Sequence, residues 1–114
     1  MPPVHSLDEV RRFAAAAGAH VQVSEHNATE PVANLFSLTP EAAEAYVLAL
    51  VGRLLPQNYA HTLTNKTPPA DVYGLEFEGR AWYIKVAFYR GLLVVISCHP
   101  PTEPLRTLAG TVKR

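Results

Sequence analysis

The chain has 114 residues, of which 48% are hydrophobic and 18% are charged. This composition is typical of a globular protein and excludes wholesale disorder, and the length fits one domain, so we expect residues 1–114 to form a single domain. Ten Lys and Arg balance ten Asp and Glu for a formal net charge of +0 at pH 7, which excludes a global positive field that would draw the chain onto nucleic acid or acidic lipid.

The start of the chain and its single cysteine predict a cytoplasmic protein with no membrane partner. Met1–His5 lacks the basic start and apolar core of a signal peptide, and no stretch reaches the ~18 apolar residues of a membrane-spanning helix. Cys98 has no second cysteine to pair with, so an internal disulfide is excluded and a reducing compartment fits best.

The first half of the sequence predicts mainly helices. Ser6 to Glu9 form a capping box that starts a helix over residues 7–17, closed by Gly18. His20–Ser24 alternates in the manner of a short edge strand. Between residues 25 and 38, Glu30-Pro31 argues against a continuous helix and leaves room for one short turn.

A second helix is predicted at Thr39-Pro40-Glu41, where Thr caps, Pro suits the first helical position and the acid suits the helix dipole. We expect it to run from Pro40 to about Leu55 and to stop at Pro56. Its apolar stripe should face the core and consists of Tyr46, Val47, Leu50, Val51 and Leu54.

The second half predicts strands, because the hydrophobic period changes to two. The expected strands are Tyr59–Thr64, Asp71–Glu78, Arg80–Tyr89 and Leu93–His99, with a loop at Asn65–Ala70. Gly79 and Gly91 supply the turns of an antiparallel meander. Residues 100–114, with three prolines, predict an extended tail. The fold class is therefore α+β, with two or more N-terminal helices packed on a C-terminal antiparallel sheet.

The register of the last two strands decides where the polar side chains point. A two-residue turn at Arg90-Gly91 would set His99 opposite Trp82 in the core, and a buried polar group without a partner costs roughly 1–3 kcal/mol. A three-residue turn over Arg90–Leu92 instead puts Val94, Ile96 and Cys98 in the core. We expect this second register, which places His99 beside Tyr83 and Ser97 beside Lys85 on the outer face, where His61 can join them. A solvated face with no site is the alternative interpretation.

Three strings resemble a known family. Asp71-Val72-Tyr73, Trp82-Tyr83-Ile84-Lys85 and Val94–His99 are similar to the sheet of the MqsR family of toxin ribonucleases, within the RelE-like superfamily, and Tyr59–Thr64 is similar to that family's F-Y-K-S-M-T segment. The resemblance runs from the helix at Pro40 to His99. It implies a RelE-like fold, endoribonuclease activity on an RNA substrate, and an antitoxin protein as partner.

Residue by residue, the resemblance implies catalytic or RNA-contacting roles for His61, Tyr83 and His99. Two family lysines fall on His61 and His99, and a family glutamine falls on Ala70. Since histidine titrates near neutrality, His61 and His99 are candidates for the base and acid of a cleavage that uses no metal and no cofactor. Lys85 is the candidate cation at the phosphate, and Lys66 is a secondary phosphate contact.

A non-catalytic protein-binding module that uses the same sheet or its edge is the competing hypothesis. The zero net charge and the missing glutamine favour this module. The shared face of Tyr83, Lys85 and His99 favours the enzyme. The other histidines, His5, His20 and His26, show no H-E-x-x-H spacing, and no nucleotide-binding or hydrolase motif occurs.

Overall fold

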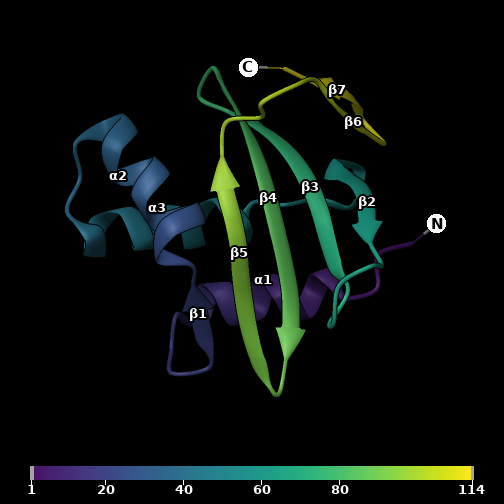
Figure 1. Ribbon diagram of the computed structural model, residues 1–114, viewed down its shortest axis with the longest axis horizontal. Helices are drawn as coiled ribbons and strands as arrows, with labels where there is room; N and C mark the ends of the chain where they lie inside the picture. The colour runs from purple at the N-terminus through teal and green to yellow at the C-terminus, as the bar shows by residue number, and fades with distance from the viewer. Residues whose placement is uncertain (1, 114) are drawn as a thin grey trace.

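The computed structural model describes residues 2–113, which form an α+β fold of three α-helices, a five-stranded mixed sheet and a small two-stranded sheet (Figure 1). The helices are α1 Leu7–Ala16, α2 Glu30–Phe36 and α3 Pro40–Gly52. The strands are β1 Val21–Val23, β2 Tyr59–Leu63, β3 Ala70–Phe77, β4 Arg80–Tyr89, β5 Leu92–His99, β6 Leu105–Thr107 and β7 Gly110–Val112. In Figure 1, α1 crosses behind the main sheet, and the face turned to the viewer carries no helix.

Both predicted helix starts are confirmed by their capping bonds. The Ser6 hydroxyl accepts the Glu9 N–H at 3.3 Å at the start of α1, and the Thr39 hydroxyl accepts the Ala42 N–H at 3.2 Å at the start of α3. Helix α3 ends at Gly52, earlier than the predicted Leu55. The Leu55 N–H donates instead to the Asn58 side chain at 2.8 Å, which begins the short turn η2, Pro56–Asn58.

The prediction that Pro31 interrupts residues 25–38 was wrong. A wide π-helical turn, η1 Glu25–Thr29, continues directly into α2. In this turn the Thr29 N–H donates to the Ser24 carbonyl at 2.9 Å, five residues back. Pro31 therefore falls in the first turn of α2, where a missing N–H costs little.

The edge strand expected near His20–Ser24 is β1, but it lies parallel to its neighbour. The main sheet has the order β1-β5-β4-β3-β2, and Val21 to Val23 pair in parallel with Leu93 to Val95. The expectation of a purely antiparallel sheet was therefore wrong at this edge. The meander β3-β4-β5 and its antiparallel pairing with β2 are confirmed.

The hydrophobic core lies between the helices and the inner face of the sheet. Trp82, Ile84 and Val86 of β4 are fully buried there, as predicted from their alternation. The predicted helix stripe is also buried at Val47, Leu50, Val51 and Leu54, while Tyr46 is half-buried against the same core. Apolar burial of this kind contributes ~25 cal/mol per Å² and is the main force that holds the helices on the sheet.

Asp71, in the string that resembles the toxin family, has a structural role. Its carboxylate is fully buried and accepts the N–H groups of Val4 at 3.0 Å and His5 at 2.8 Å. The Thr62 hydroxyl donates to it at 2.6 Å. Three donors compensate for the burial of this charge and attach the N-terminal segment to β2 and β3.

The β4–β5 hairpin differs from the predicted three-residue turn. Tyr89 pairs with Leu92, so the turn is only Arg90-Gly91, with both residues at positive φ, 51° and 78°. A β-bulge then changes the register, because Val86 pairs with Val95 whereas Lys85 pairs with Ser97, which leaves Ile96 as the extra residue.

Because of the bulge, the core residues of β5 differ from the predicted ones, whereas the polar residues expected on the outer face are found there. Leu93 and Val95 point inward before the bulge and Cys98 points inward after it, all three fully buried. Val94 and Ile96, which were expected in the core, lie half-buried on the outer face. Ser97 and His99 still reach the outer face beside Lys85 and Tyr83, as expected.

The C-terminal segment is a hairpin, so the prediction of an extended tail was wrong. Strands β6 and β7 pair with each other and pack on the outer face of β3, where Leu105, Thr107 and Val112 are buried. Its turn is fixed to the start of β2, because the Leu108 N–H donates to the Tyr59 carbonyl at 3.0 Å.

Within residues 2–113, no single helix has the length and apolar character to cross a membrane. The bent pair Glu25–Phe36 and Pro40–Gly52, at 107° to each other, reaches the required composition only when both parts are combined. The buried side chains of α2 and α3 in this pair pack into the hydrophobic core.

Candidate functional site

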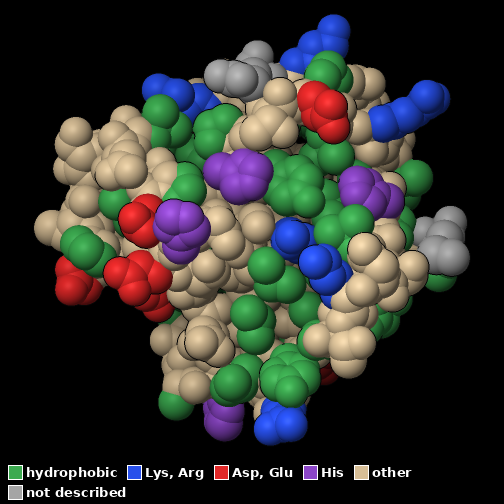
Figure 2. Space-filling view, in the orientation of Figure 1, with side chains coloured by type: hydrophobic (Ala, Val, Ile, Leu, Met, Phe, Trp, Pro, Cys, Tyr) green, Lys and Arg blue, Asp and Glu red, His purple; other side chains and the backbone are tan. Residues whose placement is uncertain are grey.

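The outer face of the main sheet contains a hollow of about 630 Å³. Its walls are strands β2, β4 and β5 on one side and the segment Thr102–Arg106 on the other. Figure 2 shows this face, on which His, Lys and Arg side chains gather around a hydrophobic centre next to the C-terminal hairpin. The hollow is lined by His61, Tyr83, Lys85, Ser97, His99, Thr102, Glu103, Pro104, Leu105 and Arg106.

Tyr83 and His99 form the best-defined part of the hollow. They are paired across β4 and β5, and their rings stack with centroids 5.0 Å apart and planes 11° apart. The His99 Nδ1–H donates to the Pro100 carbonyl at 2.8 Å, so in the neutral ring Nε2 carries the lone pair and can accept a proton. Burial raises the pKa of the Tyr83 phenol, which keeps this group a hydrogen-bond donor at neutral pH.

Lys85 and Ser97 form the next pair along the same two strands. The ammonium of Lys85 is half-buried, and burial together with the nearby charge of Lys66 lowers the pKa of Lys85. Lys66 lies exposed in the loop between β2 and β3 and does not line the hollow. Among the described residues neither lysine is in an ion pair, so both charges are available to an anion.

His61 occupies the opposite rim of the hollow. It is exposed on β2, and its row across the sheet runs through Val72 to Lys85 and then to Ser97. Three strand spacings correspond to about 14 Å between the outer members of this row. The structure thus brings Tyr83, Lys85 and His99 together on adjacent strands and puts His61 across from them.

The wall that the C-terminal segment supplies was not predicted from the sequence. Thr102, Glu103 and Arg106 line the hollow because the β6–β7 hairpin folds back over β3. The sequence did carry a signal for the hairpin itself, because Leu105-Arg106-Thr107 alternates and Gly110-Thr111-Val112 follows a two-residue turn. The three prolines at 100, 101 and 104 predict an extended segment, and this stronger pattern outweighed the alternation that indicates a hairpin.

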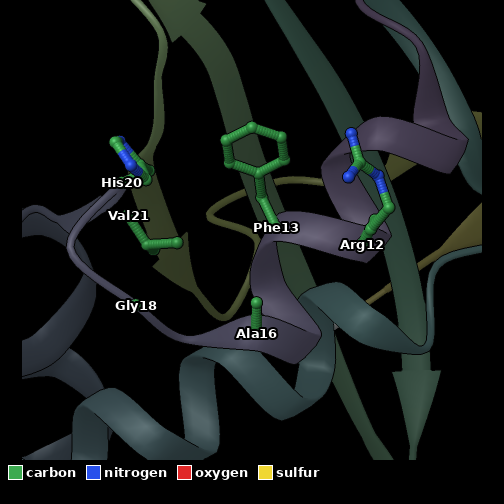
Figure 3. Close-up of a pocket in the computed structure, with 6 residues that line it drawn as sticks. All are labelled: Arg12, Phe13, Ala16, Gly18, His20 and Val21. Atoms are coloured by element: carbon green, nitrogen blue, oxygen red, sulfur yellow. The ribbon is translucent and has the colours of Figure 1, made fainter.

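Two further hollows have a different chemical character. One of about 200 Å³ lies between α1 and β1, and Figure 3 shows Phe13 at its centre, with Arg12 on one side and His20 and Val21 on the other. Arg12 is already paired with Glu9. The other, of about 300 Å³, lies on the outer face beyond Lys85 and is lined mainly by apolar residues, including Val94 and Ile96. Neither hollow holds a set of acid, base and cation.

Within the described part of the chain, no three His, Cys, Asp or Glu side chains cluster in a way that would hold a metal ion. No protein family model matches the chain, and comparison with curated proteins gives no match either. The features of the chain that bear on function are therefore the geometry of the hollow and the sequence strings of the strands that form it.

Proposed function

We propose that this protein is an MqsR-like toxin that cleaves RNA in the hollow on the outer face of its sheet, without a metal ion. The observation that carries the proposal is the convergence of His61, Tyr83, Lys85 and His99 on one hollow. Helices on one face of an antiparallel core β2-β3-β4-β5 support a RelE-like form of the α+β fold. An antitoxin protein that covers this face and a cytoplasmic location belong to the same proposal.

In the proposed reaction, Nε2 of His99 takes the proton of a ribose 2′-hydroxyl. The 2′-oxygen then attacks the adjacent phosphorus, and the bond to the 5′-oxygen of the next nucleotide breaks. His61 gives that oxygen its proton, so the products end in a 2′,3′-cyclic phosphate and a 5′-hydroxyl. In-line displacement needs base and acid on opposite sides of the phosphorus, which fits histidines on opposite rims.

Lys85 and Tyr83 stabilise the negative charge that develops on the phosphate in this reaction. Lys85 lies in the row between His61 and β5, where its ammonium stabilises the negative charge on the phosphorane oxygens. The neutral Tyr83 phenol donates a hydrogen bond to the phosphate and keeps the His99 ring in its stacked orientation. A local pair of cations, Lys85 in the hollow and the nearby Lys66, would let a chain of zero net charge hold RNA.

The test is cleavage of a synthetic single-stranded RNA by the purified protein in the presence of EDTA, with product ends identified by mass spectrometry. We expect cyclic phosphate ends, no cleavage of the 2′-deoxy analogue, and a loss of about 100-fold or more in rate for His99→Ala. His26→Ala removes an exposed histidine outside the hollow and should retain full activity. Intact RNA after incubation with folded wild-type protein would contradict the proposal.

A protein-binding module remains the second candidate, and the apolar hollow lined by Val94 and Ile96 favours it. In this case the outer face would bind a partner chain and leave RNA intact at any protein concentration. The same cleavage assay therefore separates the two proposals. A neighbouring gene for an antitoxin-like protein would support the first.

A further inference from the structure

The C-terminal hairpin packs on the main sheet over Gly74 of β3. A Cβ atom added there would lie 2.8 Å from Cγ2 of Thr107 and 2.9 Å from Cδ2 of Leu105. Both distances are shorter than van der Waals contact, so the hairpin packs this closely only because position 74 has no side chain. Gly74 is also the cross-strand partner of Tyr83, which puts the hairpin directly beside the candidate site.

The hollow is incomplete without this hairpin. Its strand side supplies Lys85, Tyr83 and the histidines, and its other side is the segment Thr102–Arg106. Arg106 lies on β6, is exposed, and has no carboxylate partner among residues 2–113. Its long side chain adds a planar guanidinium, which matches the geometry of a phosphate, to the ammonium of Lys85.

Among residues 2–113, Glu103 is the one acid that lines the hollow. It shares the hollow with Lys85 and Arg106, together with two histidines. The balance of charge therefore favours an anion, and the carboxylate weakens the binding of that anion without preventing it.

We propose that the C-terminal hairpin is part of a phosphodiester-binding site in which Arg106 is the second cation opposite Lys85, and that Gly74 positions it there. This inference rests on the proposed function for the identity of its ligand, a single-stranded oligonucleotide. Phosphate binding itself requires no cleavage, so the two proposals can fail separately.

The experiment measures the binding of a fluorescent 2′-deoxy oligonucleotide, which cannot be cleaved through a 2′-hydroxyl, by anisotropy over a range of salt concentrations. We expect Arg106→Gln to weaken binding by about tenfold, the usual effect of losing a charged hydrogen bond. The slope of log affinity against log salt should fall by about 0.7, the value for one phosphate contact on a single strand. Arg106→Lys should recover part of the affinity.

Lys113→Ala is the matched control, since it removes one exposed positive charge near the end of the same hairpin without lining the hollow. Gly74→Ala should weaken binding by displacing the hairpin, and Glu103→Gln should tighten it about two- to fivefold. Thermal melts establish that each variant is folded.

Wild-type affinity and salt slope in a folded Arg106→Gln variant would overturn the inference and leave the proposed ribonuclease intact. Weaker binding by Glu103→Gln would also overturn it, because an anion cannot gain from that carboxylate. Conversely, if Arg106→Gln weakens binding as expected while wild-type protein leaves RNA uncleaved, the anion site is supported and the proposed ribonuclease function is contradicted.

Discussion

The two faces of strand β4 differ in what they contribute. Trp82, Ile84 and Val86 point inward and are fully buried against the helices. Tyr83 and Lys85 alternate with them but point into an open hollow. Since adjacent side chains of a strand lie on opposite faces, one segment supplies both the core and the candidate site. Substitutions on the outer face should therefore change chemistry with little effect on folding.

Truncating one side chain on each face of β4 should have the largest effect and tests this difference directly. We expect Trp82→Ala to lower the free energy of unfolding by about 3–5 kcal/mol, the usual cost of removing a buried large aromatic side chain. Tyr83→Ala, at the next position, should cost about 1 kcal/mol or less. Urea denaturation measures both, and equal losses would show that the outer face is also part of the core.

A second test concerns the region where the outer face is covered. Gly74→Ala should lower the free energy of unfolding by about 1–3 kcal/mol, because the new methyl group overlaps the hairpin side chains. Gly52→Ala is the control, since no atom lies within 4 Å of a Cβ added there. If the two variants melt alike, the hairpin is not held as closely as described.

A third test concerns Cys98, which faces the core while its neighbour His99 faces the hollow. Burial raises the pKa of the Cys98 thiol to about 12, so it should react with a disulfide reagent at pH 8 only after unfolding. The unfolded thiol ionises near its ordinary value, so the free energy of unfolding should fall as pH rises from about 9 towards 12, by up to ~1.4 kcal/mol per pH unit. Cys98→Ala should reduce this slope, and a fast thiol reaction in the folded protein would contradict the inward orientation.

The smallest expected effect is at Lys85. Its pKa is lowered by burial and by Lys66, so the folded state binds its proton less readily than the unfolded chain does. The contribution of Lys85 to the free energy of unfolding should therefore rise with pH through this depressed pKa up to the ordinary value of 10.5, while the contribution of Cys98 falls above about pH 9. Lys85→Met should leave the free energy of unfolding within about 0.5 kcal/mol of wild type at pH 7, while RNA cleavage falls. A large loss of stability would assign Lys85 a structural role.

Local patterns predicted the parts of the fold that depend on neighbouring residues. Short stretches of sequence determine the caps at Ser6 and Thr39, the alternation of β3 and β4 and the position of the turn at Gly91. The outward orientation of Tyr83, Lys85 and His99 was also predicted, but from the wrong turn. The sequence favours a three-residue turn because a two-residue turn in a regular ladder would bury His99. The structure has the two-residue turn, and the bulge at Ile96 shifts the register by one residue so that His99 still points outward.

The parts that could not be predicted depend on contacts distant in sequence. Nothing in Val21–Val23 specifies a parallel pairing with β5, some seventy residues later. Nothing in Leu105–Thr107 specifies that it packs on Gly74. The second wall of the candidate site, with Arg106, depends on where the hairpin packs, so the hairpin pattern in the sequence could not by itself place Arg106 at the hollow. Pro31 shows the opposite case, in which a strong local rule was overcome by a wider helical turn.

The extra residue at position 96 makes chain length, and not only chemical identity, a determinant of what this sheet exposes. Without this irregular pairing, a regular ladder of the same residues would set Cys98 opposite Tyr83 and His99 opposite Trp82, and a thiol would face solvent where an imidazole now stands. A chain without residue 96 would form the regular ladder and still keep the imidazole opposite Tyr83. The bulge is therefore what lets a two-residue turn and an outward imidazole coexist at the present chain length.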